Sequence, residues 1–306
     1  MIRPPALAPG ARVALVAPAG PLAEGAVDRA VERVRDWGFE PVEGAHVRGR
    51  HGYLAAPDAE RAADFDAALR DPSIDAVWCL RGGYGTMRIV DALDWDALAR
   101  HPRPVIGFSD ITALHLAIQR LGIVSFHGPH PATAELNPFS RGGLVRLLTS
   151  AEPAGVLPFP AENGRAEAFA GGAAEGPLVG GNLSLVAATL GTPYQVRAEG
   201  AILFLEEVGE PAYRVDRLLS QLRLAGVLGS VAGVALGAFT ESPDEGAEGT
   251  PQIAEVLHDR LADLGVPVAF GFPFGHVDDN WTLPLGVRAR LDADAGTLEL
   301  LEPAVG

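Results

Sequence analysis

Short hydrophobic runs alternate with amphipathic helical patterns through the first half of the chain, and this alternation constrains the fold more than any other feature. The run Val13–Ala17 is followed by apolar residues at helical spacing from Val27 to Trp37. Further strands are expected at residues 39–43, 76–80 and 105–108, and further helices at residues 58–69 and 110–121. Strands joined by helices in this order predict an α/β fold, with a parallel sheet covered on both faces.

Two polar segments follow strands of this expected sheet. Arg81-Gly82-Gly83-Tyr84-Gly85 comes after the strand 76–80, and Ser109 comes after the strand 105–108. Because ligands of parallel sheets collect at the carboxyl ends of the strands, we expect the two segments to lie close together. The glycines let backbone N–H groups approach a phosphate or an oxyanion. The loop has neither the glycine order of a dinucleotide site nor the Gly-Lys-Ser/Thr of a P-loop.

The second half reads as a separate, mixed domain. Residues 148–176 are rich in Ala, Glu, Gly and Pro and have no sustained period, which is typical of a connection between domains. We therefore expect a domain at residues 1–150, a linker at 151–175 and a domain at 176–306. Strands are expected at 202–205, 231–239 and 268–272, helices at 182–190, 213–224 and 253–264, and a hairpin at 287–301.

Charge and cysteine content exclude several classes of protein. The chain carries 24 Lys and Arg against 39 Asp and Glu, a formal charge of −15, so we expect no nucleic-acid partner and no attraction to anionic membranes. No hydrophobic run is long enough to span a bilayer, and residues 1–10 do not resemble a secretory signal. The single Cys79 excludes an internal disulfide and lies in an apolar run, as a buried thiol would. These features predict a soluble cytoplasmic protein.

Ser109 lies in the segment Gly107-Phe108-Ser109-Asp110, where a strand changes to a helix without a linker. A serine at such a turn exposes its hydroxyl beside the N–H groups of a helix start, as a nucleophile with an oxyanion intermediate requires. A second interpretation is equally physical. Serine is a preferred helix N-cap, and an acidic residue beside it suits the positive end of the helix dipole.

Two further segments present ionisable side chains in fixed positions. Glu206 follows the strand 202–205, where a carboxylate is suited to orient an imidazole, although an acidic helix start is the alternative for this segment. His276 lies in a loop stiffened by glycine and proline, Gly271-Phe272-Pro273-Phe274-Gly275-His276, although a solvated loop histidine is the simpler interpretation. His127 and His130 match no established zinc spacing, so we expect no metal site.

With these segments in view, the chain resembles the LD-carboxypeptidases, the muramoyltetrapeptide carboxypeptidase family of serine peptidases. Five marks in one order carry the resemblance, which runs nearly end to end: Arg81–Gly85, Gly107–Asp110, Gly180-Gly181-Asn182-Leu183-Ser184, Phe204–Glu207 with Tyr213–Arg217, and Gly275-His276 with Asn280–Gly286. The family usually has Glu-Asp where this chain has Glu206-Glu207, and Glu206 matches the motif by its place in the pair.

The resemblance implies a flavodoxin-like N-terminal domain, a C-terminal mixed β/α domain and an active site between them. It places the serine nucleophile on Ser109, the glutamate on Glu206 and the histidine base on His276. The implied substrate is the peptidoglycan stem tetrapeptide, whose terminal D-Ala is released during cytoplasmic recycling of cell-wall fragments. No cofactor or metal is implied, and family members are often homodimers.

Two groups of residues complete the expected site. The N–H groups of Gly83 and Asp110 are expected to form the oxyanion hole, because the glycine loop and the helix start should meet at the sheet edge. A free substrate carboxylate needs a donor, for which Arg81, Tyr84 and Arg88 are the candidates.

Two rival functions remain. The microcin-immunity branch of the same family cleaves acylated adenylates with a similar triad; it is usually longer, with an added aromatic loop that this chain lacks. The other rival is a two-domain binding protein without chemistry, whose cleft holds a peptide or nucleotide.

Overall fold

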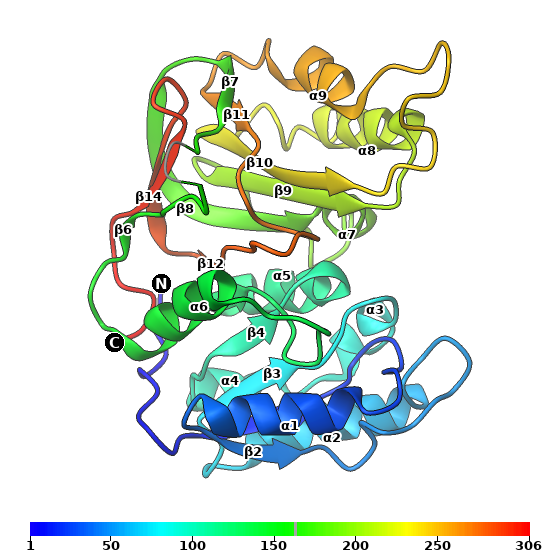
Figure 1. The fold of residues 1–306 in the computed structure, drawn as a ribbon, viewed down its shortest axis with the longest axis vertical. Helices are drawn as coiled ribbons and strands as arrows, with labels where there is room; N and C mark the ends of the chain where they lie inside the picture. The colour runs from blue at the N-terminus through cyan, green and yellow to red at the C-terminus, as the bar shows by residue number, and fades with distance from the viewer. Residues whose placement is uncertain (162–163) are drawn as a thin grey trace.

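Two β-sheets, one above the other, organise the chain in the computed structural model, which describes residues 1–161 and 164–306. In Figure 1 the N-terminal half (blue to cyan) forms the lower body, and most of the C-terminal half forms the upper one. The arrangement confirms a two-domain α/β fold.

The lower sheet has six strands in the order β12-β5-β4-β3-β1-β2. Its first five strands along the chain are parallel, as the alternating pattern predicted. They are β1 (Arg12–Val16), β2 (Glu40–Glu43), β3 (Ala76–Cys79), β4 (Val105–Gly107) and β5 (Ser125–His127). The helices of this half are α1 (Ala26–Asp36), α2 (Asp58–Arg70), α3 (Thr86–Ile89), α4 (Trp95–Arg100), α5 (Thr112–Leu121) and α6 (Pro138–Thr149), with short 3₁₀ turns η1 (Val90–Ala92) and η2 (Ser109–Ile111).

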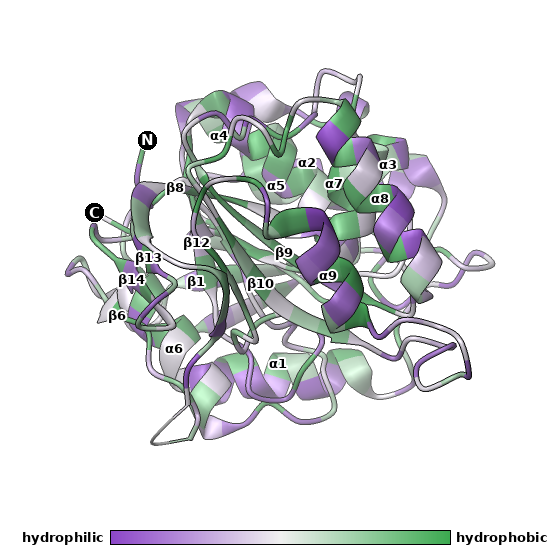
Figure 2. Ribbon diagram, turned by 90° about the horizontal axis from the view of Figure 1, so that it is seen from above, coloured by the Kyte–Doolittle hydropathy of each residue, from purple (hydrophilic) through white to green (hydrophobic). Residues whose placement is uncertain are grey.

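Helices cover both faces of the lower sheet because successive side chains of each strand point in opposite directions. Val13 and Leu15 of β1 pack in one hydrophobic cluster with residues of α1 and α6. Ala14 and Val16 pack in another, with residues of α2, α4 and α5. Figure 2 shows the result: hydrophobic strands in the middle, and hydrophilic residues on outer helices such as α1.

The upper sheet has eight strands in the order β6-β14-β13-β8-β9-β10-β11-β7. Its central strands β8, β9, β10 and β11 are parallel, whereas the outer pairings are antiparallel. The strands are β6 (Gly155–Val156), β7 (Glu167–Ala170), β8 (Ala173–Asn182), β9 (Ile202–Val208), β10 (Gly233–Thr240), β11 (Val268–Phe270), β13 (Arg288–Asp292) and β14 (Thr297–Leu300). The helices are α7 (Leu183–Ala188), α8 (Ala212–Leu224) and α9 (Ile253–Leu261).

The two faces of the upper sheet have different neighbours. Leu203 and Leu205 of β9 pack against residues of α7, α8 and α9. Ile202 and Phe204, on the opposite face, belong to the hydrophobic cluster that also contains residues of β1 and α1. The domains therefore share a core, and a residue at position 206 continues the face that is turned toward the N-terminal domain.

Segment 151–175 is more than the linker that its composition suggested. It contains β6 and β7, which form the two edges of the upper sheet, and the first residues of β8. Edge strands this short are too brief to show a sustained period-2 pattern, which is why composition alone missed them. The apolar pattern predicts a strand that ends at Leu205, whereas β9 continues through Glu206 and Glu207 to Val208.

The chain returns to the lower body near its end. Strand β12 (Leu283–Leu285) pairs antiparallel with β5 of the lower sheet, a crossing that the sequence did not predict. The two termini lie side by side (Figure 1), and the Gly306 N–H donates to the Pro4 carbonyl. Over the described ranges, no helix combines the length and the apolar character needed to cross a membrane.

Candidate active site

Ser109 occupies a strained turn at the carboxyl end of β4. Its φ is 62°, and Glu241 is the only other non-glycine residue in the described parts of the chain with a positive φ. An L-residue in this region costs about 1–2 kcal/mol, so the surrounding structure must hold it there. The residue at the N-cap position of η2 is Phe108, and no hydrogen bond of the Ser109 hydroxyl occurs among the described residues. The interpretation of Ser109 as a helix cap is therefore not supported.

Asp110 fixes the turn from the other side. Its buried carboxylate accepts a hydrogen bond of 2.9 Å from the Thr86 N–H, and the Thr86 hydroxyl donates to the Asp110 carbonyl at 2.6 Å. Burial raises the pKa of Asp110 despite these hydrogen bonds. The side chain thus ties η2 to α3, which follows the glycine loop, and holds the loop and the serine turn together.

The backbone of the glycine loop lies in direct contact with Ser109. A Cβ built on Gly82 would lie 2.8 Å from the Ser109 Cβ and 3.0 Å from its Oγ, so only glycine fits. The next N–H belongs to Gly83, and neither it nor the Asp110 N–H donates a hydrogen bond within the described residues. Gly83 follows the residue that contacts Ser109, and Asp110 follows Ser109 itself, so two N–H groups without an acceptor in the described parts of the chain flank this contact, as an oxyanion would require.

A hydrogen bond joins Glu206 of β9 to His276 of the loop that follows β11. The His276 Nδ1–H donates to Glu206 Oε2 at 2.7 Å, and Glu206 is fully buried, with 0% of its surface exposed. Burial lowers the pKa of His276, but the hydrogen bond and the negative charge of Glu206 outweigh it, so the net pKa is raised. This arrangement fixes the tautomer and leaves Nε2 of the imidazole as the proton acceptor.

Glu207 points the opposite way, because neighbouring residues of a strand face opposite sides. Its carboxylate accepts hydrogen bonds from the Asn182 side chain and from the Ser184 and Val208 N–H groups, at 2.8, 2.8 and 2.9 Å. Burial raises the pKa of Glu207. Glu207 therefore holds the start of α7, and of the two carboxylates it is Glu206 that contacts the histidine.

The serine turn and the histidine loop meet around Phe108, which the sequence analysis did not single out. The Phe108 ring lies 4.8 Å from the His276 ring and 4.6 Å from the His130 ring, centroid to centroid. The domains are also linked behind the serine, where the Asn182 N–H donates to the Thr112 hydroxyl at 3.0 Å. No hydrogen bond joins Ser109 to His276 in the described structure; in unliganded sites this contact is often long and shortens with substrate.

Three further histidines are buried near this site. His115 accepts from the Ser125 hydroxyl and donates to the Gly107 carbonyl, and His130 donates through Nδ1 to the Cys79 carbonyl. Burial lowers the pKa of His115 and of His130 to about 4, and lowers that of His127 well below its usual value. Within residues 1–161 and 164–306, no three His, Cys, Asp or Glu side chains are grouped to hold a metal.

The three candidates for the substrate carboxylate differ in their surroundings. Arg88 is held by Asp58 through three hydrogen bonds of 2.7–3.0 Å, so its charge is already neutralised. Tyr84 is half exposed and packs edge-on against Tyr53 at 5.7 Å. Arg81 donates one hydrogen bond of 2.7 Å to the Pro21 carbonyl and lines a cavity next to the serine loop.

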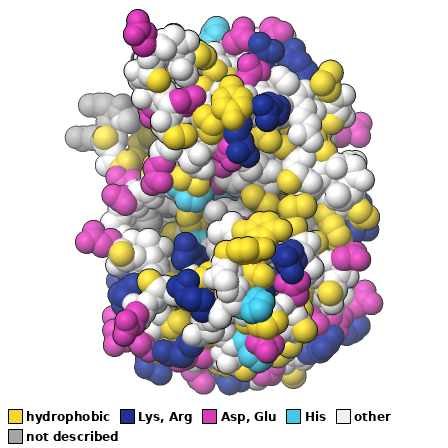
Figure 3. Space-filling view, turned by 90° about the vertical axis from the view of Figure 1, so that its right-hand side faces the viewer, with side chains coloured by type: hydrophobic (Ala, Val, Ile, Leu, Met, Phe, Trp, Pro, Cys, Tyr) yellow, Lys and Arg dark blue, Asp and Glu magenta, His cyan; other side chains and the backbone are white. Residues whose placement is uncertain are grey.

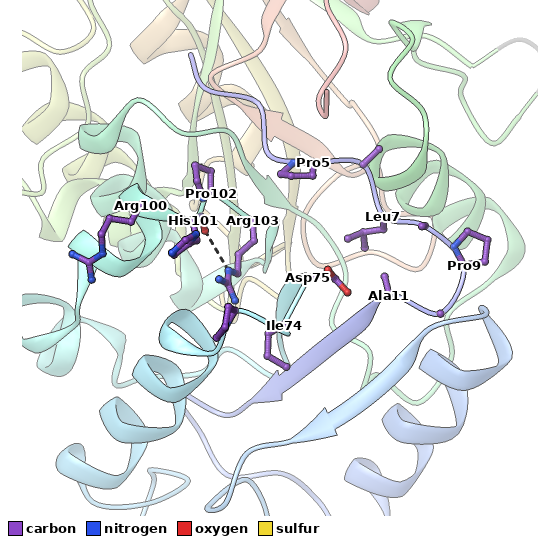
Figure 4. Close-up of a pocket in the computed structure, with 14 residues that line it drawn as sticks. Pro5, Leu7, Pro9, Ala11, Ile74, Asp75, Arg100, His101, Pro102 and Arg103 are labelled. Carbon is purple, nitrogen blue, oxygen red and sulfur yellow. Dashed lines mark hydrogen bonds between the residues drawn. The ribbon is translucent and has the colours of Figure 1, made fainter.

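A larger cavity, of about 570 Å³, lies at the amino ends of the lower strands, away from Ser109. Figure 4 shows its lining: the N-terminal segment around Leu7 on one side, and Arg100–Arg103 on the other. Arg103 turns back onto the chain and donates to the His101, Ala68 and Asp71 carbonyls. The strand ends that carry Ser109 and the glycine loop are at the opposite edge of the sheet, so this cavity is separate from the candidate active site.

Gly275 sets the position of Glu206, and its replacement is a direct test of the geometry. A Cβ at Gly275 (φ 107°) would lie 2.8 Å from both Cβ and Oε2 of Glu206. We expect Gly275→Ala to displace the carboxylate and lower kcat by about a hundred-fold, as an error of about 1 Å in a catalytic group does. The measurement is turnover of a substrate at saturation.

Gly271 offers the matched control, because its φ is 98° and nothing lies within 4 Å of its Cβ position. Gly271→Ala therefore introduces similar backbone strain, about 1–2 kcal/mol, without touching Glu206. Equal kcat values for the two variants would contradict the role assigned to Gly275.

The chain is similar to known proteins over nearly its whole length. The family description "LD-carboxypeptidase N-terminal domain" matches residues 13–128, and "LD-carboxypeptidase C-terminal domain" matches residues 175–291. A putative carboxypeptidase of Streptomyces coelicolor is 45% identical over 100% of this chain and 98% of its own length. The murein tetrapeptide carboxypeptidase of Pseudomonas aeruginosa is 36% identical over 92% of this chain and 94% of its own.

Two solved structures are similar over nearly the whole chain. The muramoyltetrapeptide carboxypeptidase of Oxalobacter formigenes is 33% identical, with a TM-score of 0.82 over 94% of this chain and 97% of its own. A microcin C7 self-immunity protein in complex with aspartyl sulfamoyl adenosine is 25% identical, with a TM-score of 0.91 over 100% of both chains.

Proposed function

The chain belongs to the LD-carboxypeptidase family, and from this membership we propose that it is a serine carboxypeptidase that releases the terminal D-Ala of murein stem tetrapeptides. The bond cleaved is the amide between an L-centred diamino acid and D-Ala. The observation that carries the proposal is the pair of fixed groups, the His276–Glu206 hydrogen bond of 2.7 Å and the strained turn of Ser109, joined through the Phe108 ring. The murein peptidases among the relatives support this substrate class.

In the proposed mechanism Ser109 attacks the scissile carbonyl while His276 Nε2 takes its proton. The buried Glu206 carboxylate balances the charge that forms on the imidazole. The Gly83 and Asp110 N–H groups donate to the oxyanion of the tetrahedral intermediate. His276 then protonates the leaving amine, D-Ala departs, and water hydrolyses the acyl-enzyme by the same steps in reverse order.

The proposal also includes the cellular location and the oligomeric state of the protein. We propose a cytoplasmic reaction, because the family resemblance implies recycling of cell-wall fragments in the cytoplasm. The homodimer is proposed from the resemblance to the family.

A second candidate function has support from the structural similarity to the microcin C7 self-immunity protein bound to aspartyl sulfamoyl adenosine. A serine hydrolase with this fold is suited to acyl adenylates as well as to peptides. The two candidates differ in the leaving group, which is an amino acid in one case and a nucleotide derivative in the other.

Release of free D-Ala from a purified muramyl tetrapeptide tests the proposal. We expect release from the tetrapeptide that ends in D-Ala, and little from the otherwise identical peptide that ends in L-Ala, since the reversed centre exchanges the methyl group and the carboxylate in the site. Cleavage of an acylated adenylate without any D-Ala release would instead establish the second candidate. Failure of the protein to cleave either compound would favour a binding protein without chemistry.

A further inference from the structure

A cavity of about 340 Å³ opens next to the glycine loop that contacts Ser109, and it has no role in the chemistry described so far. Its walls come from α1, from the end of β3 and from the segment after β5, and include Arg29, Arg81, His130 and Thr133. Arg81 immediately precedes Gly82, whose Cβ position is 3.0 Å from the Ser109 Oγ, and the His130 ring contacts Phe108. All residues that line the cavity belong to the lower half of the molecule, and Figure 3 shows histidine and arginine side chains near the hollow between the two halves.

The charge in this cavity is positive, although the protein as a whole is acidic. No Asp or Glu lines it, and the formal charge of the chain is −15. Across residues 1–161 and 164–306, neither Arg29 nor Arg81 forms an ion pair, whereas Arg88 is neutralised by Asp58. Two exposed guanidinium groups without an acidic partner, in a cavity whose wall leads into the glycine loop, are suited to bind a carboxylate.

The rest of the lining is suited to a small amino acid. Four alanines, at positions 23, 26, 132 and 134, line the cavity and give part of its wall an apolar surface that a methyl group can contact. His130 is 6% exposed; its Nδ1–H donates to the Cys79 carbonyl, and its Nε2 has no partner in the described residues. The neutral Nε2 is therefore a buried acceptor without a partner on a residue of the cavity wall, and an N–H group of a ligand would satisfy it.

The wall formed by the segment after β5 is held in place. Arg33 of α1 donates to the Pro131, Thr133 and Ala134 carbonyls, at 2.5, 2.8 and 3.4 Å. This clamp ties the segment to the same helix that carries Arg29. The cavity is therefore bounded by fixed elements, as a specificity site requires.

We infer that this cavity receives the C-terminal residue of the substrate: Arg81 and Arg29 hold its carboxylate, His130 accepts from its N–H, and the alanine lining contacts its methyl group. The inference rests on the proposed function, because D-Ala is the residue that such an enzyme releases. It makes Arg81 a specificity-determining residue, which explains how the enzyme selects a terminal residue instead of cutting within a peptide.

The test compares the tetrapeptide with its C-terminal amide, which lacks the negative charge. We expect Arg81→Gln to lower kcat/KM for the free acid by about 10- to 100-fold, the effect of losing a hydrogen bond to a charged group, and to lower kcat/KM for the amide much less, so that the preference for the acid over the amide falls. Arg35→Gln is the matched control, because Arg35 is an exposed residue of the same helix as Arg29 and does not line the cavity. An Arg81→Gln enzyme that keeps the wild-type preference for acid over amide would overturn the inference and leave the proposed function intact.

Binding of the product D-alanine distinguishes a failure of the proposed function from a failure of the inference about the cavity. If the wild-type protein releases no D-Ala at all, the proposed function is wrong, and thermal unfolding with added D-alanine or D-alaninamide decides about the cavity. A rise in the unfolding midpoint with D-alanine only, absent in Arg81→Gln, supports the carboxylate site. No rise in the wild-type protein overturns it.

Discussion

Replacing Ser109 with alanine is expected to lower kcat for D-Ala release by about ten-thousand-fold or more, because no other group of the site can form the acyl-enzyme. The variant should remain folded, since the hydrogen bonds around the turn involve the Asp110 carboxylate and carbonyl and not the Ser109 hydroxyl. The measurement is single-turnover release of D-Ala together with the unfolding midpoint. Residual activity near the wild-type level would show that Ser109 is not the nucleophile.

The same position allows a test of the strain that the turn stores. At φ 62° a glycine is relaxed and an alanine is not, so Ser109→Gly should be more stable than Ser109→Ala by about 0.5–1 kcal/mol, after the entropy cost of glycine is included. Both variants should lack activity. Chemical denaturation measures the difference.

Ser220 supplies the matched control for that comparison, because it lies inside helix α8. Ser220→Gly should be less stable than Ser220→Ala by about 1 kcal/mol, a difference opposite in sign to the one expected at position 109. If glycine is also the less stable residue at position 109, the turn is not strained and the argument for an exposed, fixed nucleophile fails.

Replacing Glu206 with glutamine is expected to lower kcat by about 10³- to 10⁴-fold, because the amide neither fixes the tautomer of His276 nor balances its charge. The pH profile should also change in a defined direction. The hydrogen bond and charge of Glu206 raise the pKa of His276 against the effect of burial; without them only the smaller effects of the Glu207 and Glu241 charges oppose burial, and the pKa falls. Since the neutral imidazole is the active base, the acid limb of kcat/KM should move to lower pH while the plateau drops.

Glu207→Gln is the control, because the two carboxylates are neighbours with separate partners. An amide at 207 would turn one N–H₂ group toward the donors Asn182, Ser184 or Val208, which should destabilise the fold by about 1–3 kcal/mol. We expect its acid limb to stay close to that of the wild type. A Glu207→Gln profile that shifts as far as that of Glu206→Gln would mean that the pair was assigned in the wrong order.

Much of the lower domain was determined by the sequence itself, because its signals are local. A strand such as β4 needs only a short apolar run, and the change to helix after Ser109 is visible within about ten residues. The parallel order of β1 to β5 follows from the helices between them. For the same reason the neighbourhood of Ser109 and the glycine loop could be predicted, since both follow strands of one parallel sheet.

The tertiary structure decided what depends on partners far away in the chain. Arg81 and Arg88 are seven positions apart, and the sequence does not say that Asp58 neutralises one of them and leaves the other available in a cavity. Nor does it show that β12 joins the lower sheet, or that β6 and β7 close the edges of the upper one. Such pairings are chosen by the free energy of the whole fold, to which a few residues contribute little local preference. The different roles of Glu206 and Glu207 depend on both the sequence and the tertiary structure. Alternation along the strand makes the two side chains face opposite sides, and only the packing of the domains determines which side holds His276.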